Sequence, residues 1–161
     1  MTPQFYTIGV FNSTEKEFFE KLIANGIDTF CDIRQRRGVR GAKYVFVNSK
    51  RLQQKLKELD IFYEYLPELA PPPEIRELQK EKDLADKITN KQRQKLAKAF
   101  VNEYKSRILK PFNFEGLLAH FEKNNSTRVV FFCVEEHHEA CHRSLVTQFL
   151  NEHFNCPITH L

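Results

Sequence analysis

Short apolar runs alternate with amphipathic stretches along most of the chain, and this alternation predicts strands and helices in turn. Residues 5–10 and 27–34 are rich in β-branched and aromatic residues and too short for helices, so each is predicted to be a buried strand. Between them, residues 14–26 carry apolar side chains at helical spacing. Thr14 and Glu17 have the spacing of a capping box, which predicts a helix beginning there. The chain therefore opens with the order strand, helix, strand.

The later sequence continues the alternation. Leucines at helical spacing over 52–59 predict a helix, and residues 61–66 predict a third strand. The most apolar strand is expected at 128–135, and its composition favours the centre of the sheet. A helix over 140–154 and a short strand over 157–161 follow. These elements predict an α/β fold with a three-layer, Rossmann-like, mostly parallel sheet and helices on both faces.

A proline-rich stretch, PELAPPP, interrupts the alternation after the third strand, because consecutive prolines cannot continue hydrogen-bonded structure. Beyond it, half of the residues over 74–98 are charged, yet apolar residues still recur at helical spacing. We therefore expect a single domain over residues 1–161 with a charged helical insertion at about 68–110, laid over the core as a lid. A charged surface helix without function is the alternative interpretation.

Length and composition agree with one globular domain. The chain has 161 residues, of which 41% are hydrophobic, and this is enough for a packed core. No stretch reaches the roughly 18 uninterrupted apolar residues of a membrane span, and the N-terminus lacks the order of a signal peptide. We therefore expect a cytoplasmic protein without membrane association, whose cysteines are reduced thiols. The cysteines are Cys31, Cys133, Cys141 and Cys156.

Positive charge is concentrated in one segment. The formal net charge is only +4, but residues 34–51 carry seven lysines and arginines and no acid, so this segment would attract phosphate. One interpretation is a non-catalytic nucleic-acid-binding module that uses this basic loop, with Tyr44 and Phe46 as stacking residues. Its basic contacts would be Arg36, Arg37, Arg40 and Lys43.

Polar residues follow three of the predicted strands. They are Gly9 and Asn12 after the first strand, Asp32 and Arg34 in the second, and Cys133 and Glu135 in the strand at 128–135. Open parallel sheets bind ligands at the carboxyl ends of their strands. Strand residues two apart point to the same face. We therefore expect both polar pairs to face one crevice.

The segment CVEEHHEACHRS, residues 133–144, leads from this strand into the next helix. Cys141 and His142 continue the buried stripe of that helix into its first turn, and no capping side chain precedes them. The first amides are therefore free for an anion. A helix N-terminus, a histidine and Arg143 each lower the pKa of a neighbouring thiol. Cys141 could then act as a nucleophile, with His142 or Glu135 handling protons.

These residues favour an enzyme, a hydrolase or transferase with an anion or phosphate pocket at the strand ends. Its substrate would be a phosphate-bearing small molecule, such as a nucleotide, or a nucleic-acid component. The catalytic residues would be Glu135, Cys141 and His142. The residues that bind the anion would be Gly9, Asn12, Asp32, Arg34, Cys133 and Arg143.

Zinc binding is a third interpretation, because cysteine, histidine and glutamate all ligate zinc. The donors would be Cys133, Glu135, His138, Cys141 and His142. The chain has no CxxC pair, and adjacent helical residues such as Cys141 and His142 diverge by about 100°. We therefore expect no cofactor, with zinc as the alternative.

The sequence resembles the domain of unknown function 488 family. The resemblance rests on TIGVFNST near the start, DIR after the second strand, FYEYLPELA after the third, and above all CVEEHHEACHRS. It implies a compact Rossmann-like fold and a site, and the family's name assigns no reaction. The family pattern carries over onto Gly9, Asn12, Asp32, Arg34, Tyr63, Glu68, Cys133, Glu135, Cys141, His142 and Arg143.

The chain departs from the family pattern at several positions. Val10 and Phe11 stand where the family usually has histidine and serine, so a histidine that served relatives as a base or ligand would be missing here. Arginines follow DIR where a proline is frequent. Tyr65 replaces a common histidine and Ala70 a common glycine.

Overall fold

Five parallel strands form one sheet in the structure, a computed structural model that describes residues 2–161. The strands are β1 (Gln4–Ile8), β2 (Thr29–Asp32), β3 (Phe62–Tyr65), β4 (Arg128–Phe132) and β5 (Ile158–His160). Their order is β3-β2-β4-β1-β5. The predicted α/β fold is confirmed, and the apolar strand expected at the centre is β4.

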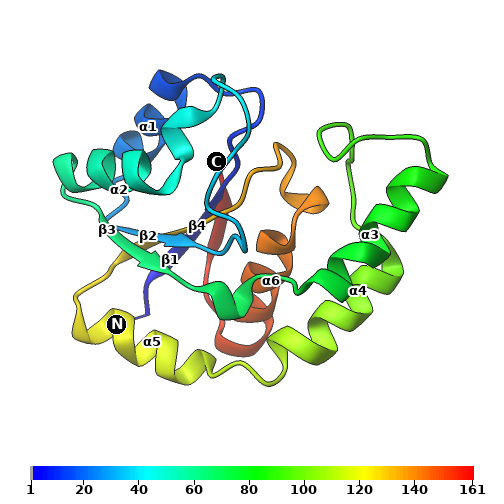
Figure 1. Ribbon diagram of the computed structural model, residues 1–161. Helices are drawn as coiled ribbons and strands as arrows, with labels where there is room; N and C mark the ends of the chain where they lie inside the picture. Colours follow the sequence, from blue (N-terminus) through cyan, green and yellow to red (C-terminus); the bar gives the residue numbers. More distant parts are fainter. Residues whose placement is uncertain (1) are drawn as a thin grey trace.

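Helices cover both faces of the sheet (Figure 1). They are α1 (Glu15–Ala24), α2 (Ser49–Glu58), α3 (Pro73–Ala85), α4 (Lys98–Tyr104), α5 (Phe114–Lys123) and α6 (His142–Phe154). The first two pack on one face, and α5 and α6 pack on the other, which completes the predicted three layers. Within residues 2–161, no helix has the length and apolar character needed to cross a membrane.

The first helix begins as its sequence predicts. The Thr14 side chain accepts a hydrogen bond from the Glu17 amide at 3.2 Å, and the Glu17 carboxylate accepts one from the Thr14 amide at 3.4 Å. This reciprocal pair satisfies two amides that the helix itself cannot use. Gly26, at φ +61°, adopts the left-handed conformation that turns the chain into β2.

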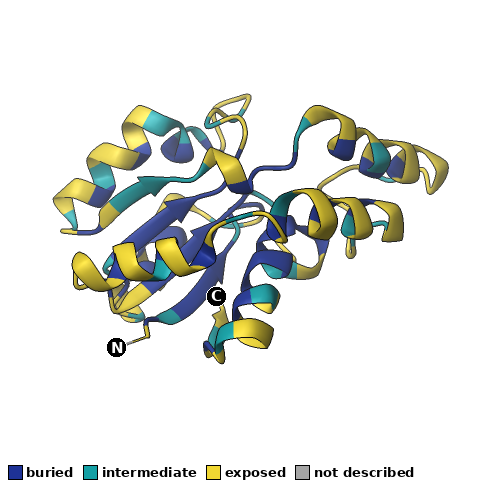
Figure 2. Ribbon diagram, turned by 90° about the horizontal axis from the view of Figure 1, so that it is seen from below, coloured by how far each residue is buried: buried dark blue, intermediate teal, exposed yellow. Residues whose placement is uncertain are grey.

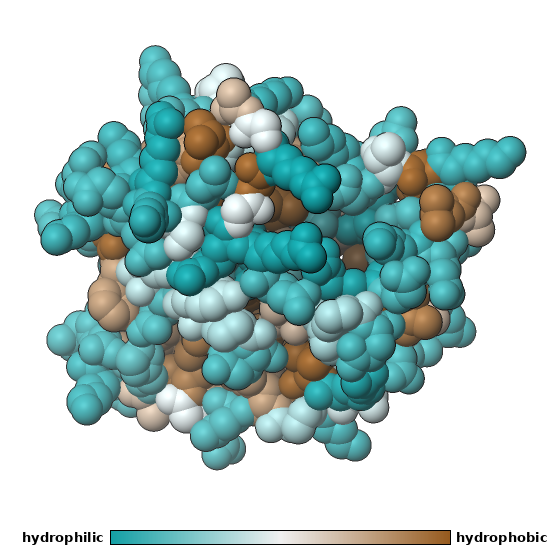
Figure 3. Space-filling view, in the orientation of Figure 1, coloured by the Kyte–Doolittle hydropathy of each residue, from teal (hydrophilic) through white to brown (hydrophobic). Residues whose placement is uncertain are grey.

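The strand β4 is buried on both of its faces, as a central parallel strand must be. Val129 and Phe131 point into the core beneath α5 and α6, whereas Val130 and Phe132 point into the core beneath α1 and α2. The inner strands β1, β2 and β4 are mostly buried, whereas the edge strands β3 and β5 are partly exposed (Figure 2). The face of the molecule seen in Figure 3 is mostly hydrophilic, with apolar side chains in separate patches.

The segment after β3 leaves the sheet and carries α3 and α4, which lie to one side of the strands (Figure 1). Ile75 and Phe100 join the core on the α6 side, and the Tyr104 hydroxyl donates to the Leu69 carbonyl at 2.5 Å. Most of the outward surface of α3 and α4 is exposed (Figure 2). The apolar side chains of α3 and α4 therefore hold this charged segment against the core, and most of the segment's other residues face solvent.

Most predicted element ends differ from the structure by a few residues, and two of these differences concern the loop between β4 and α6. The strand ends at Phe132, so Cys133 and Glu135 lie in the loop. The helix begins at His142, and Cys141 is its N-cap with extended backbone angles of φ −134° and ψ 145°. The prediction extended both elements because apolar pattern does not mark where regular backbone stops.

We expect Phe18→Ala to lower the free energy of unfolding by about 3–5 kcal/mol, since this substitution removes a buried ring. Phe18 is fully buried and its ring contacts those of Phe30, Phe46 and Phe132. Urea denaturation followed by circular dichroism measures the change. The matched control is Phe62→Ala, at a ring that is 53% exposed, which should cost less than about 1 kcal/mol. Equal losses in the two variants would contradict the described core.

Candidate functional site

The loop between β4 and α6 is held by one buried arginine. Arg143, which is 1% exposed, donates from Nη1 to the Glu135 carbonyl at 2.6 Å and from Nη2 to the Glu136 carbonyl at 3.1 Å. The end of β1 touches the same loop, because a Cβ on Gly9 would lie only 1.9 Å from the Glu135 carbonyl oxygen. Only glycine fits there, so Gly9 shapes the site through its missing side chain.

The loop brings two thiols and an imidazole together. The side-chain donor atoms of Cys133, Cys141 and His142 all lie within 4.8 Å of one another, and all three residues are buried. Cys141 Sγ is 3.7 Å from His142 Nδ1. The expected divergence of these two side chains is wrong, because Cys141 is extended rather than helical. The three groups form a donor set of the kind that binds zinc, with Glu135 beside it.

The orientation of His142 is fixed by the backbone of Ile33, the residue that follows β2. Its Nε2 lies 2.9 Å from the Ile33 carbonyl, which can only accept, so Nε2 carries a proton and Nδ1 faces the Cys141 thiol. The edge of the Tyr104 ring packs against the imidazole, with ring centroids 5.6 Å apart. Tyr104 comes from α4, so the segment after β3 contributes one wall of the site.

Cys141 and His142 favour the charged forms of each other. Burial opposes the charge on both, but the Cys133 hydrogen bond and the His142 charge together hold the pKa of Cys141 well below its usual value. Burial would lower the pKa of His142, yet the Cys141 thiolate and the Ile33 carbonyl raise it. Cys133 behaves in the opposite way: its hydrogen bond to Cys141 and its burial raise its pKa. These shifts favour the thiolate form of Cys141, the cationic form of His142 and the neutral form of Cys133.

Glu135 completes the cluster. The Cys133 thiol donates to its Oε2 at 3.3 Å, and Arg93 donates to its Oε1 at 2.9 Å. Burial and the negative charge of Cys141 raise the pKa of Glu135 to about 7, against the opposing charges of Arg93 and His142. A carboxyl group with this pKa can both donate and accept a proton near neutral pH.

Arg93 links the segment after β3 to the site, and sequence reasoning missed it. Besides Glu135, it donates to the Ala140 carbonyl at 3.1 Å and to Asp83 at 2.7 Å. The Leu96 amide also donates to the Glu139 carbonyl at 3.2 Å. These contacts place residues 93–96 over the loop before α6. Arg93 is one of many cations in a charged segment, so nothing in the sequence distinguished it as a residue of the site.

Asp32 and Arg34 do not join the cluster. Arg34 donates to both carboxylate oxygens of Asp32, at 2.9 and 2.8 Å, and to the Val47 carbonyl at 2.9 Å. Asp32 lies opposite Phe132 in the sheet register, so both point toward α1 and α2, and Cys133 comes one residue later on the other face. The expectation that both polar pairs face one crevice is therefore wrong: the alternation of β4 is out of phase with that of β2 at these positions.

The arginines expected to hold an anion are largely committed to the protein. Within residues 2–161, two guanidinium atoms are buried without a hydrogen-bond partner, Arg34 Nη1 and Arg143 Nε. No side chain caps the N-terminus of α6. Asn12 is exposed at the rim and donates to the Glu136 carboxylate at 2.6 Å. Two donors and a helix N-terminus thus remain near the strand ends.

The basic loop presents its cations to solvent. Arg36, Arg40 and Lys43 are exposed, and Arg37 lies over the Tyr65 ring at 4.1 Å. Tyr44 and Phe46 are each 3% exposed, so their predicted stacking role is wrong. Both side chains fill the core beneath α1. The sequence gave no indication of this burial, because the two aromatic residues stand among charged residues of the loop.

The comparisons with known proteins identify a family for the chain and no individual relative. No curated protein and no solved structure matches the chain. Residues 14–150 match the family described as "Domain of unknown function DUF488". This range includes every residue of the buried cluster and excludes Gly9 and Asn12. From its match over most of its length, the chain belongs to the DUF488 family.

Proposed function

We propose that the chain is an enzyme that catalyses hydrolysis or group transfer with Cys141 as its nucleophile. One observation carries the proposal: Cys141 Sγ lies 3.7 Å from an imidazole whose far nitrogen is fixed by a carbonyl. A thiol, a base and a group that orients the base are the parts of an activated nucleophile. The lowered pKa of Cys141 and the raised pKa of Glu135 support the same assignment.

The roles follow from the contacts. The Cys141 thiolate attacks an electrophilic centre of the substrate and forms a bond from sulfur to that centre. The bond to the leaving group breaks, and protonated Glu135 gives its proton to the leaving atom. Water or another acceptor then loses a proton to the Glu135 carboxylate and attacks the same centre. The sulfur bond breaks and Cys141 leaves as a thiolate, which His142 stabilises as its cation.

The substrate in this proposal carries a phosphate or similar anion, as in a nucleotide or a nucleic-acid component. The support is the buried and unpartnered Nε of Arg143, which belongs to the residue that holds the loop. The uncapped N-terminus of α6 adds positive potential at the same place. The thiolate of Cys141 is stabilised by the same positive potential, so the anionic group of the substrate would bind beside the thiolate.

Access to Cys141 requires movement of the covering segment. Cys141 is only 1% exposed, and Arg93 joins the loop of the site to Asp83 on α3. We propose that α3, α4 and the residues between them act as a lid, whose opening breaks the contacts of Arg93 and admits the substrate.

Alkylation by iodoacetamide tests the state of Cys141 without a known substrate. Peptide mass mapping at about pH 7 should show labelling of Cys141 but not of Cys31, whose pKa is raised by burial and by Glu64 and Asp32. Arg93→Ala should raise the labelling rate of Cys141 about tenfold by opening the lid. A matched variant, Arg107→Ala, removes an exposed arginine of the same segment and should leave the rate unchanged.

Two outcomes would contradict the nucleophile assignment. One is equal labelling of Cys31 and Cys141 across the pH range. The other is near-stoichiometric zinc in the purified protein by elemental analysis, lost in Cys133→Ser, since the thiolate would then be a metal ligand.

Turnover tests the role of Glu135. With nitrophenyl phosphate esters and nucleoside monophosphates as the substrate panel, Cys141→Ala should abolish product release. Glu135→Gln should lower kcat about 100-fold and remove the pH limb near neutrality, because the amide cannot exchange a proton. Glu115→Gln, at an exposed carboxylate on α5, is the control. A hydrolysable substrate that turns over equally well in the Cys141→Ala variant would refute the mechanism.

The raised pKa of Glu135 also predicts a pH dependence of stability. Its usual value is 4.5 and its value in the fold is about 7, so the folded protein binds more protons than the unfolded chain within that window. Stability relative to Glu135→Gln should therefore fall as pH rises through the window, by about 3 kcal/mol. Urea unfolding at several pH values measures the difference. A flat difference curve would show that the Glu135 carboxyl has an ordinary pKa.

A further inference from the structure

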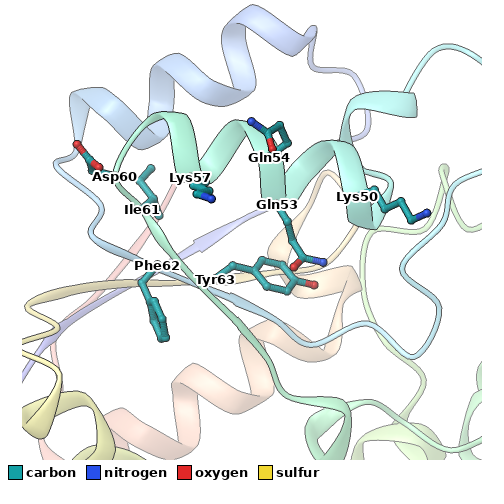
Figure 4. A pocket seen from close by; sticks show the side chains of 8 residues that line it. All are labelled: Lys50, Gln53, Gln54, Lys57, Asp60, Ile61, Phe62 and Tyr63. Carbon is teal, nitrogen blue, oxygen red and sulfur yellow. The ribbon is translucent and has the colours of Figure 1, made fainter.

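A second polar groove lies away from the cluster, between α2 and the edge strand β3. Its volume is about 660 Å³. Lys50, Gln53 and Lys57 line it from α2, and Tyr63 lines it from β3 (Figure 4). Lys50 lies toward one end and Asp60 toward the other, and the ring of Phe62 points away from the remaining labelled side chains (Figure 4). Neither the buried cluster nor its lid contributes a residue to this groove.

Two lysines and one acid, Asp60, line the groove, and neither lysine forms an ion pair within residues 2–161. Neighbouring cations on α2 are paired, Arg51 with Glu15 at 3.5 Å and Lys55 with Glu58 at 3.9 Å. Lys50 and Lys57 have no acidic partner within residues 2–161. A helix that pairs some of its cations and leaves those along a groove free presents a row of positive charge there.

The positive charge extends beyond the groove into the preceding loop. Arg36 and Arg40 are exposed and likewise have no acidic partner in the described chain. Arg37 lies over the Tyr65 ring on the same strand that forms the groove. Cations spread from this loop along the groove suit a ligand that carries several phosphates along a backbone better than they suit a single phosphate.

The edge strand adds aromatic surface to this charge. Tyr63 and Tyr65 are two residues apart on β3, so both rings lie on its α2 side. Tyr63 is stacked on Phe30, with ring centroids 6.2 Å apart and planes at 17°, and its hydroxyl donates to Asp32 at 2.8 Å. One ring face is thus backed by the core and the orientation is fixed, while the residue stays half-buried at the groove.

We propose that this groove binds single-stranded nucleic acid. Lys50 and Lys57 would contact backbone phosphates, and the fixed ring of Tyr63 would stack on an unpaired base. The flat ring favours this ligand over an acidic peptide, which has no base to stack. An unpaired strand is favoured over a duplex, whose bases are not available to a ring at a sheet edge. The site goes beyond the proposed reaction, since Cys141 lies in the separate buried cluster.

Fluorescence anisotropy with a labelled thymidine oligonucleotide at low salt tests the proposal. Lys50→Glu with Lys57→Glu should weaken binding more than tenfold, and Lys50→Ala with Lys57→Ala should reduce the slope of log K against log salt by about 1.4. Lys110→Glu with Lys123→Glu makes the same charge change at exposed lysines outside the groove and should change affinity less than about threefold.

The aromatic contribution has its own pair of variants. Tyr63→Phe keeps the ring and should bind within about twofold of the wild type, whereas Tyr63→Leu should lose about tenfold. Circular dichroism and urea denaturation of each variant exclude loss of fold as the cause. Cys141→Ser should bind the oligonucleotide as the wild type does, which separates this site from the proposed reaction.

Four results would overturn the proposal. The first is no binding of the oligonucleotide by the wild type at low salt. The second is an equal loss in the two pairs of charge-reversed variants, which would show non-specific attraction. The third is tighter binding of the matching duplex than of the single strand. The fourth is displacement of the oligonucleotide by polyglutamate at equal charge concentration, which would identify an acidic polypeptide as the ligand class.

Discussion

The hydrogen bonds from Arg143 to the carbonyls of Glu135 and Glu136 are the constraint on which the site depends. A buried guanidinium must find acceptors, because leaving its charge and its donors unsatisfied in the interior would cost several kcal/mol. Here the acceptors are backbone atoms of the loop, so satisfying the charge also fixes the path of the chain. Gly9 allows this path by leaving room for the Glu135 carbonyl. With the loop in place, Cys141 occupies the N-cap position of α6 in an extended conformation, and its thiol lies 3.7 Å from His142 Nδ1.

Burial then makes the cluster chemically unusual. Cys133, Cys141, His142 and Glu135 are shielded from water, so each charge is felt strongly by its neighbours. The pKa of Cys141 is lowered and that of His142 is raised, each by the charge of the other, whereas the pKa of Cys133 is raised and that of Glu135 is raised to about 7. Titratable groups that lie within a few ångströms of one another and have pKa values shifted in opposite directions are typical of functional sites. Arg93, from a segment that is otherwise mostly solvent-exposed, lowers the pKa of Glu135 through its positive charge.

The sequence supported much of the fold and part of the site. The order of strands and helices, the capping box of α1 and the central position of β4 follow from local pattern, which acts over a few residues. The concentration of Cys133, Glu135, Cys141 and His142 in a short segment marked the cluster, since nearness in sequence limits separation in space. The prediction for Asp32 and Arg34 was wrong, because alternation shows which residues of one strand share a face but not which face they share with residues of another strand.

The sequence by itself determined which side chains each element buries, since burial within an element follows from its own period. Only the tertiary structure decided which elements share a site. The register of β2 against β4 separated Asp32 from Cys133, and the packing of the segment after β3 brought Arg93 and Tyr104 to Glu135 and His142. It also buried Tyr44 and Phe46 in the core while leaving Tyr63 at the sheet edge. These outcomes depend on contacts between distant parts of the chain, and no local pattern carries them.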